Sequence, residues 1–189
     1  MKRVIIPDKT GNSVIDLCLD TIEKRKQALV FVNTRRSSEK TAEDIARKIK
    51  TTKQMENLRL LSDKILGSLE RPTKQCERLA ACVKKGIAFH HSGLTSKQRE
   101  HIEESFRNGL IKIICCTPTL AYGLDLPAFR VVIKDLKRYG MRGLAWIPVL
   151  EYLQQSGRAG RPRFDKTGES IAVASTKPEK EEIRRRRSP

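Results

Sequence analysis

The sequence predicts an α/β domain of three layers, in which a mainly parallel β-sheet is flanked by helices. Short β-branched runs alternate along the chain with stretches whose apolar residues recur at helical spacing, as βαβ units do. The chain has 189 residues, 38% of them hydrophobic, which is enough to bury the core of one domain. We expect this domain to span residues 1–176.

The first predicted strand, at residues 28–32, leads into an amphipathic helix. That helix carries Ala42, Ile45, Ala46 and Ile49 at offsets of three, four and seven, so that they share one face. Residues 51–85 then read as an inserted helical pair, broken near Gly67. A second strand is predicted at residues 86–89.

The next helix has recognisable start and stop signals. Thr95 and Gln98 form a predicted capping box, Ile102 and Phe106 supply the buried face, and Gly109 ends the helix. Three more strands are predicted at residues 111–116, 130–133 and 170–174. From residue 177 to 189 the chain is highly charged and is expected to form a flexible basic tail.

The charge balance predicts a polyanionic partner. Lysine and arginine number 39 against 22 acidic residues, a net charge of +17. Nucleic acid is the first candidate for such a partner and an anionic membrane surface the second. No apolar run approaches the ~20 residues of a membrane span, and no signal peptide is apparent. We therefore expect a soluble protein.

The cysteines indicate a reducing compartment. Their number is five, an odd count, and none form a CxxC pair, so a disulfide framework is disfavoured. A zinc site made of Cys76, Cys82, His90 and His91 is conceivable, but the spacing fits no standard pattern, and no metal site is expected. We expect one of the two histidines to be buried and the other exposed.

Polar turns follow the first three predicted strands. These turns begin at Asn33, His90 and Thr117. In open parallel sheets the carboxyl ends of the strands line the ligand crevice, where helix N-termini offer N–H groups to anions. The sequence thus predicts a basic, phosphate-binding edge.

A fourth element, residues 154–162 (QQSGRAGRP), places Arg158 and Arg161 on a short glycine-flanked loop. Paired guanidiniums suit a triphosphate, because each binds phosphate oxygens bidentately. However, no glycine precedes a lysine and no Asp-Glu dipeptide occurs, so the usual phosphate cradle and Mg²⁺-binding acidic pair are missing. We infer that another domain holds the nucleotide. A dinucleotide-binding enzyme is disfavoured, because no GxGxxG follows the first strand.

Taken together, the motifs resemble those of the second RecA-like domain of Ski2-like superfamily-two helicases. The matching stretches are residues 30–36 (VFVNTRR), 90–94 (HHSGL), 106–112 (FRNGLIK), 117–128 (TPTLAYGLDLPA) and 154–162. Residues 133–139 (IKDLKRY) and 161–165 (RPRFD) are similar to the archaeal DNA-repair and replication-fork branch. The resemblance extends from about residue 10 to 175.

The resemblance implies roles in ATP binding and hydrolysis. Arg158 and Arg161 would reach the γ-phosphate, with Gln154 nearby, while Gly123 and Asp125 would lie close to the nucleotide. ATP with Mg²⁺ would be held mainly by the first RecA-like domain. Asp125 stands where many members of the family have asparagine.

The resemblance also implies a nucleic-acid-binding surface. Thr117 would contact a phosphate of single-stranded or forked nucleic acid, DNA in the case of the archaeal branch. The strand-tracking groove would be lined by Asn33, Thr34, Arg35, His91, Ser92 and Gly93. The chain also departs from the family at Ser92, where alanine is common, and at Gln155, in the 154–162 motif, where methionine is common.

The function implied is that of the second motor domain of an ATP-dependent DNA helicase, acting in the cytoplasm at the nucleoid. By itself the chain is expected to hydrolyse no ATP. The alternative is a non-catalytic RecA-like module that only binds nucleic acid.

Overall fold

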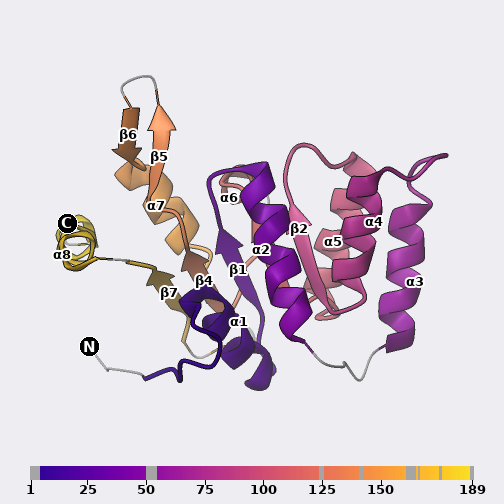
Figure 1. Cartoon of the computed structure of the whole chain (residues 1–189), viewed down its shortest axis with the longest axis horizontal. Helices are drawn as coiled ribbons and strands as arrows, with labels where there is room; N and C mark the ends of the chain where they lie inside the picture. Colours follow the sequence, from indigo (N-terminus) through magenta and orange to yellow (C-terminus); the bar gives the residue numbers. More distant parts are fainter. Residues whose placement is uncertain are drawn as a thin grey trace.

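The computed structural model describes residues 5–49, 55–123, 126–140, 143–160, 165, 167–174 and 176–187. It confirms the α/β prediction, with a five-stranded parallel sheet in the order β2-β3-β1-β4-β7 and a separate antiparallel pair, β5 and β6 (Figure 1). The strands are β1 (Ala28–Phe31), β2 (Ile87–His90), β3 (Ile113–Cys116), β4 (Arg130–Ile133), β5 (Lys137–Gly140), β6 (Gly143–Trp146) and β7 (Glu169–Ala172). The helices are α1 (Ser13–Glu23), α2 (Arg35–Lys48), α3 (Met55–Leu66), α4 (Lys74–Val83), α5 (Ser96–Arg107), α6 (Thr119–Gly123), α7 (Val149–Ser156) and α8 (Lys177–Arg187).

Helices cover both faces of the sheet. From β1 the chain passes through α2, α3 and α4 to β2, and α5 then brings it back to β3, which lies between β1 and β2. Because parallel crossovers are right-handed, these two connections lie on opposite faces. Figure 1 shows α2 in front of the sheet and α6 behind it. Every residue of β1 to β4 is buried, as a sheet covered on both faces requires.

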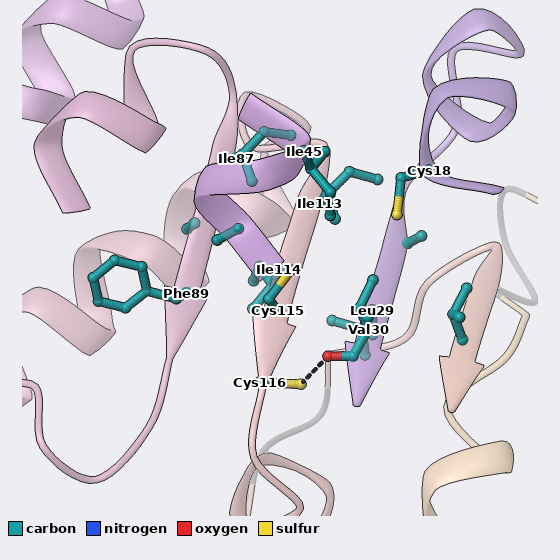
Figure 2. Close-up of a cluster of buried hydrophobic side chains, with 14 of the residues drawn as sticks. Cys18, Leu29, Val30, Ile45, Ile87, Phe89, Ile113, Ile114, Cys115 and Cys116 are labelled. Atoms are coloured by element: carbon teal, nitrogen blue, oxygen red, sulfur yellow. Dashed lines mark hydrogen bonds between the residues drawn. The ribbon is translucent and has the colours of Figure 1, made fainter. Parts of the chain in front are cut away.

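The core is built around the two central strands β1 and β3 (Figure 2). Cys18 of α1 and Ile45 of α2 are both fully buried beside these strands. All five cysteines are buried and free, and burial raises the pKa of the Cys18 thiol to about 12. Cys18 therefore acts as a small apolar side chain in the packing.

Local signals place the helices where the sequence predicted them. Thr95 accepts from the backbone N–H of Gln98, whose side chain accepts from the N–H of Thr95, so the capping box is confirmed. Gly109 follows α5 with φ of 74°, a left-handed conformation that ends the helix at little cost for glycine. Ile102 and Phe106 are buried as expected.

A buried arginine ties α1 to the sheet. Arg130 of β4 is fully buried, and its Nη2 lies 2.8 Å from Asp20 Oδ2 and 2.6 Å from Glu169 Oε2. Its Nη1 donates to the carbonyl of Leu17 at 2.7 Å and to Thr21 Oγ1 at 2.8 Å. The charge is thereby compensated by two carboxylates from neighbouring elements, as a buried cation requires.

Residues 177–187, within the segment expected to be a flexible basic tail, form α8 in the structure. Ile183 is only 8% exposed and lines a small cavity with Leu136 and Tyr152. Glu179 pairs with Lys137 of β5 at 3.0 Å. The buried side chain of Ile183 and the ion pair between Glu179 and Lys137 thus attach α8 to the rest of the domain. From its charged composition alone, this segment was expected to be solvated.

Candidate nucleic-acid interface

An open groove of about 470 Å³ lies at the carboxyl edge of the sheet. Its lining residues follow β1, β2 and β3 or come from β5 and α7. They are Asn33, Arg35, Ser92, Thr117, Pro118, Thr119, Arg138 and Glu151. Four of them, Asn33, Arg35, Ser92 and Thr117, were predicted from the sequence, and the structure brings these four together.

The turn after β1 is fixed by contacts at both ends. Asn33 donates its backbone N–H to Asp135 Oδ2 at 3.0 Å, and its Nδ2 donates to the carbonyl of Lys137 at 2.5 Å. Thr34 caps α2, because its Oγ1 accepts from the N–H of Ser37 at 3.0 Å. The side chains of Asn33 and Thr34 thus both form hydrogen bonds within the domain, and Thr34 is nevertheless exposed to solvent.

Arg35 and Ser92 join the first two turns in the lining of the groove. Arg35 Nη2 donates to Ser92 Oγ at 2.8 Å, and both residues are exposed. A guanidinium has five N–H donors, and this contact uses one nitrogen, so Arg35 can still bind a phosphate oxygen.

His91 does not reach the surface. Its side chain is 0% exposed and stacks on Phe89 with ring centroids 5.6 Å apart. Its Nδ1 accepts from the backbone N–H of Gly93 at 3.1 Å, so its Nε2 carries the proton and donates to Glu39 Oε1 at 3.1 Å. Burial lowers the pKa of His91, which keeps this neutral tautomer at neutral pH. His91 therefore shapes the turn from below instead of lining the groove.

The expectation of one exposed histidine is wrong, because His90 is also buried. Its Nε2 lies 2.8 Å from Glu103 Oε1, and burial lowers its pKa. Each histidine meets a carboxylate from a helix distant in sequence, Glu103 for His90 and Glu39 for His91. Such pairs leave no local signal in the sequence.

Glu39 connects the turn to two helices. It accepts from Gln75 Nε2 at 2.6 Å and from Arg78 Nη1 at 2.5 Å, as well as from His91. Burial alone raises the pKa of Glu39, but hydrogen bonds from Gln75 and Arg78 hold it below its ordinary value. An ionised Glu39 thus anchors α4 and the turn that contains Gly93.

Gly93 is closely packed. A Cβ at this position would lie 3.0 Å from His91 Nδ1 and 3.4 Å from Arg35 Nη1. A larger residue would therefore fit only if one of these side chains moved by a few tenths of an ångström.

The third turn contributes hydroxyl groups. Thr117 Oγ1 and Thr119 Oγ1 lie 2.9 Å apart, and the backbone N–H of Thr117 donates to the carbonyl of His90 at 3.3 Å. Thr117 is 8% exposed, whereas Thr119 is exposed. The pair therefore offers hydroxyls from the end of β3 to the same groove.

Two of the groove residues come from outside the three predicted turns, and the sequence did not mark them. Arg138 comes from β5 and Glu151 from the first turn of α7, and Arg138 Nη1 lies 2.9 Å from Glu151 Oε2. Glu151 is only 4% exposed, while the Arg138 side chain is 45% exposed. Lys137–Gly140 and Gly143–Trp146 are largely exposed, so no apolar pattern in the sequence marks this hairpin, and its position beside the groove depends on tertiary packing.

The glycine-flanked loop after α7 is joined to the segment between β3 and β4. Arg158 is half-buried, and its Nη2 donates to the carbonyl of Ala121 in α6 at 2.6 Å. The N–H of Ala128 donates to the carbonyl of Arg158 at 2.9 Å, and the N–H of Gly160 donates to that of Ala128 at 2.7 Å. Gly160 has φ of 101°, which favours glycine. Two motifs far apart in sequence are thus held together.

The other residues predicted near the nucleotide are partly described. Gly123 ends α6, and Gln154 lies on α7, half-buried, two residues before the helix ends at Ser156. Asp125 and Arg161 lie outside the described residues.

Within the described ranges, no three His, Cys, Asp or Glu side chains gather closely enough to hold a metal ion. Cys76 instead accepts from Gln98 Nε2 at 3.1 Å. Among the described helices, none is both long and apolar enough to cross a membrane.

Comparison with known proteins relates the chain to helicases. The family described as "helicase conserved C-terminal domain" matches residues 62–163. Three similar proteins, each named ATP-dependent DNA helicase Hel308, come from Methanococcus vannielii (44% identical, 86% of this chain), Pyrococcus abyssi (48%, 87%) and Methanocella arvoryzae (48%, 86%). The matched region makes up 22%, 23% and 22% of these relatives, so the chain spans less than a quarter of their length. With more than half of its residues matched, the chain belongs to the helicase conserved C-terminal domain family.

Proposed function

We propose that this chain is the second motor domain of an ATP-dependent DNA helicase, with residues 1–176 forming its RecA-like unit. The observation that carries the proposal is the groove, where Asn33, Arg35, Ser92 and Thr117 meet from three separate turns. The relatives named as ATP-dependent DNA helicases support DNA as the polymer. Such a motor would act in the cytoplasm at the nucleoid.

The groove chemistry suits a nucleic-acid backbone. Its lining offers the guanidinium of Arg35 and the hydroxyls of Ser92, Thr117 and Thr119. Guanidinium and hydroxyl groups are common donors to phosphate oxygens, and they read no base sequence. This composition supports a strand held by its backbone, with Thr34 and Gly93 at the margin and His91 beneath it.

The loop around Arg158 suits a second phosphate group, that of a nucleotide. A guanidinium on a glycine-flanked loop fits a triphosphate, and Gln154 lies one helical turn before it. ATP with Mg²⁺ would supply the phosphoryl group that is transferred, and a first RecA-like domain would hold most of it. In this proposal Arg158 and Arg161 offset the charge that develops on that group, with Gly123 and Asp125 alongside.

The test is ATP turnover in a chimaera in which this chain replaces the matching part of the Pyrococcus abyssi relative. Arg158→Ala should lower DNA-stimulated turnover by about 10³-fold, as removal of an arginine finger does. Arg107→Ala, an exposed arginine at the end of α5, is the matched control and should leave turnover unchanged.

Two results would contradict the proposal. If Arg158→Ala leaves ATP turnover unchanged, the Arg158 loop takes no part in phosphoryl transfer. A chimaera that binds DNA but never hydrolyses ATP would favour the alternative, a RecA-like module that only binds nucleic acid.

A further inference from the structure

A carboxylate lies in a groove that otherwise suits phosphates. Glu151 is the one acidic residue among the described residues that line the groove, and it is only 4% exposed. By Coulomb repulsion, an anion here opposes the binding of a phosphate unless a neighbouring cation compensates it. Glu151 is in contact with such a cation.

That cation is Arg138. Its Nη1 lies 3.1 Å from Glu151 Oε1 and 2.9 Å from Oε2, so both carboxylate oxygens hold one guanidinium nitrogen. The Arg138 side chain is 45% exposed, and a guanidinium carries donors on its other nitrogens as well. Arg138 can thus contact Glu151 and a strand phosphate at the same time, and the two anions compete for its charge.

Glu151 also contacts the residue one turn further along α7. Gln155 Nε2 donates to Glu151 Oε1 at 3.3 Å, and Gln155 is 2% exposed. The carbonyl of Gln155 accepts from the backbone N–H of Arg158 at 3.2 Å. A chain of contacts therefore runs from Arg138 in the groove, through Glu151 and Gln155, to the backbone of Arg158.

We propose that Glu151 is a positioning residue that couples occupancy of the groove to the position of the Arg158 loop. When a strand phosphate binds the Arg138 guanidinium, the ion pair between Arg138 and Glu151 weakens. Glu151 Oε1 also accepts a hydrogen bond from Gln155. A shift of Glu151 therefore moves Gln155 at the end of α7, and with it the loop that contains Arg158. The inference rests on the proposed function, because it assigns the groove to a strand and the loop to ATP.

The experiment measures ATP turnover with and without saturating single-stranded DNA, in the chimaera described above. Glu151→Gln keeps the shape of the side chain and removes its charge. We expect the stimulation of turnover by DNA to fall by about fivefold or more, the range of a typical coupling energy, while the affinity for the strand stays equal or increases. Glu151→Asp, which retains the charge, should restore part of the stimulation.

A second variant and two controls separate coupling from folding. Gln155→Met removes the link to Glu151 without touching the groove, so it should lower the stimulation and leave strand affinity unchanged. In an Arg138→Ala background, Glu151→Gln should have no additional effect. Glu43→Gln removes a carboxylate from another arginine pair, with Arg78, outside the groove, and should not alter the stimulation.

The outcomes distinguish this inference from the proposed function. If wild-type DNA stimulation persists in both Glu151→Gln and Gln155→Met, the coupling role is wrong, even where Glu151→Gln binds DNA more tightly. If the unmodified chain binds no single-stranded DNA at all, the proposed function itself is wrong, whatever the Glu151 variants do. The thermal unfolding midpoint of each variant is measured as well, so that a loss of turnover caused by unfolding of the domain can be recognised.

Discussion

His91 Nδ1 accepts a hydrogen bond from the backbone N–H of Gly93 at 3.1 Å, so a side chain that never reaches solvent sets the shape of an exposed turn. The same turn presents Ser92 Oγ to Arg35 Nη2 at 2.8 Å. Glu39 holds the other side of the His91 ring. The geometry of the groove thus depends on a buried network beneath it.

Gly93→Ala tests this dependence. The added Cβ would lie 3.0 Å from His91 Nδ1 and 3.4 Å from Arg35 Nη1, so one of them must move. We expect the dissociation constant for a single-stranded oligonucleotide to rise by roughly fivefold, about 1 kcal/mol, as measured by fluorescence anisotropy. Gly140→Ala adds a methyl group to open space and controls for the substitution itself. Equal affinities of the two variants would contradict the role of the turn.

Stability should fall as the pH drops below about 6.5, the ordinary pKa of histidine. Burial lowers the pKa of both His90 and His91, so below that pH the unfolded chain binds protons that the folded chain does not. Unfolding is then favoured, by at most about 1.4 kcal/mol per pH unit for each histidine. Stability contributed by the lowered pKa of Glu39 is lost only at lower pH, below its ordinary value of 4.5.

Urea unfolding at pH 7.5 and 5.5 measures this effect. The double variant His90→Gln, His91→Gln should be less stable at pH 7.5 but should lose less stability on acidification. An equal loss in both proteins would show that other groups cause the pH dependence.

Arg130→Met tests the buried ion-pair network. The substitution leaves Asp20 and Glu169 without the guanidinium they share, and we expect the free energy of unfolding to fall by about 3 kcal/mol. Arg47→Met removes an exposed arginine that pairs with Asp44, and should change stability little. Chemical denaturation compares the two. A similar small change in both variants would mean that the network contributes no net stability.

Much of the sheet was predictable because its strands are apolar on both faces. The predicted strand at 130–133 coincides with β4, and the other predicted strands lie within two residues of those observed. The groove residues Asn33 and Thr117 were predictable for a topological reason, since they follow parallel strands whose carboxyl ends share an edge.

The features that escaped prediction depend on contacts distant in sequence. Lys137–Gly140 and Gly143–Trp146 are largely exposed, so no apolar pattern marks the hairpin. α8 is polar apart from Ile183, whose burial depends on a cavity formed by other elements. His91 looked available to a ligand because its partner, Glu39, lies 52 residues away.

The salt dependence of strand binding tests the central claim most directly. With the 189-residue chain and a labelled single-stranded DNA, log Kd should rise steeply with log salt concentration, and Arg35→Ala should reduce the slope by about 0.7. Arg59→Ala, an exposed arginine on α3 away from the groove, should leave the slope unchanged. Affinity that does not vary with salt, or the same slope for both variants, would contradict a groove that holds a nucleic-acid backbone.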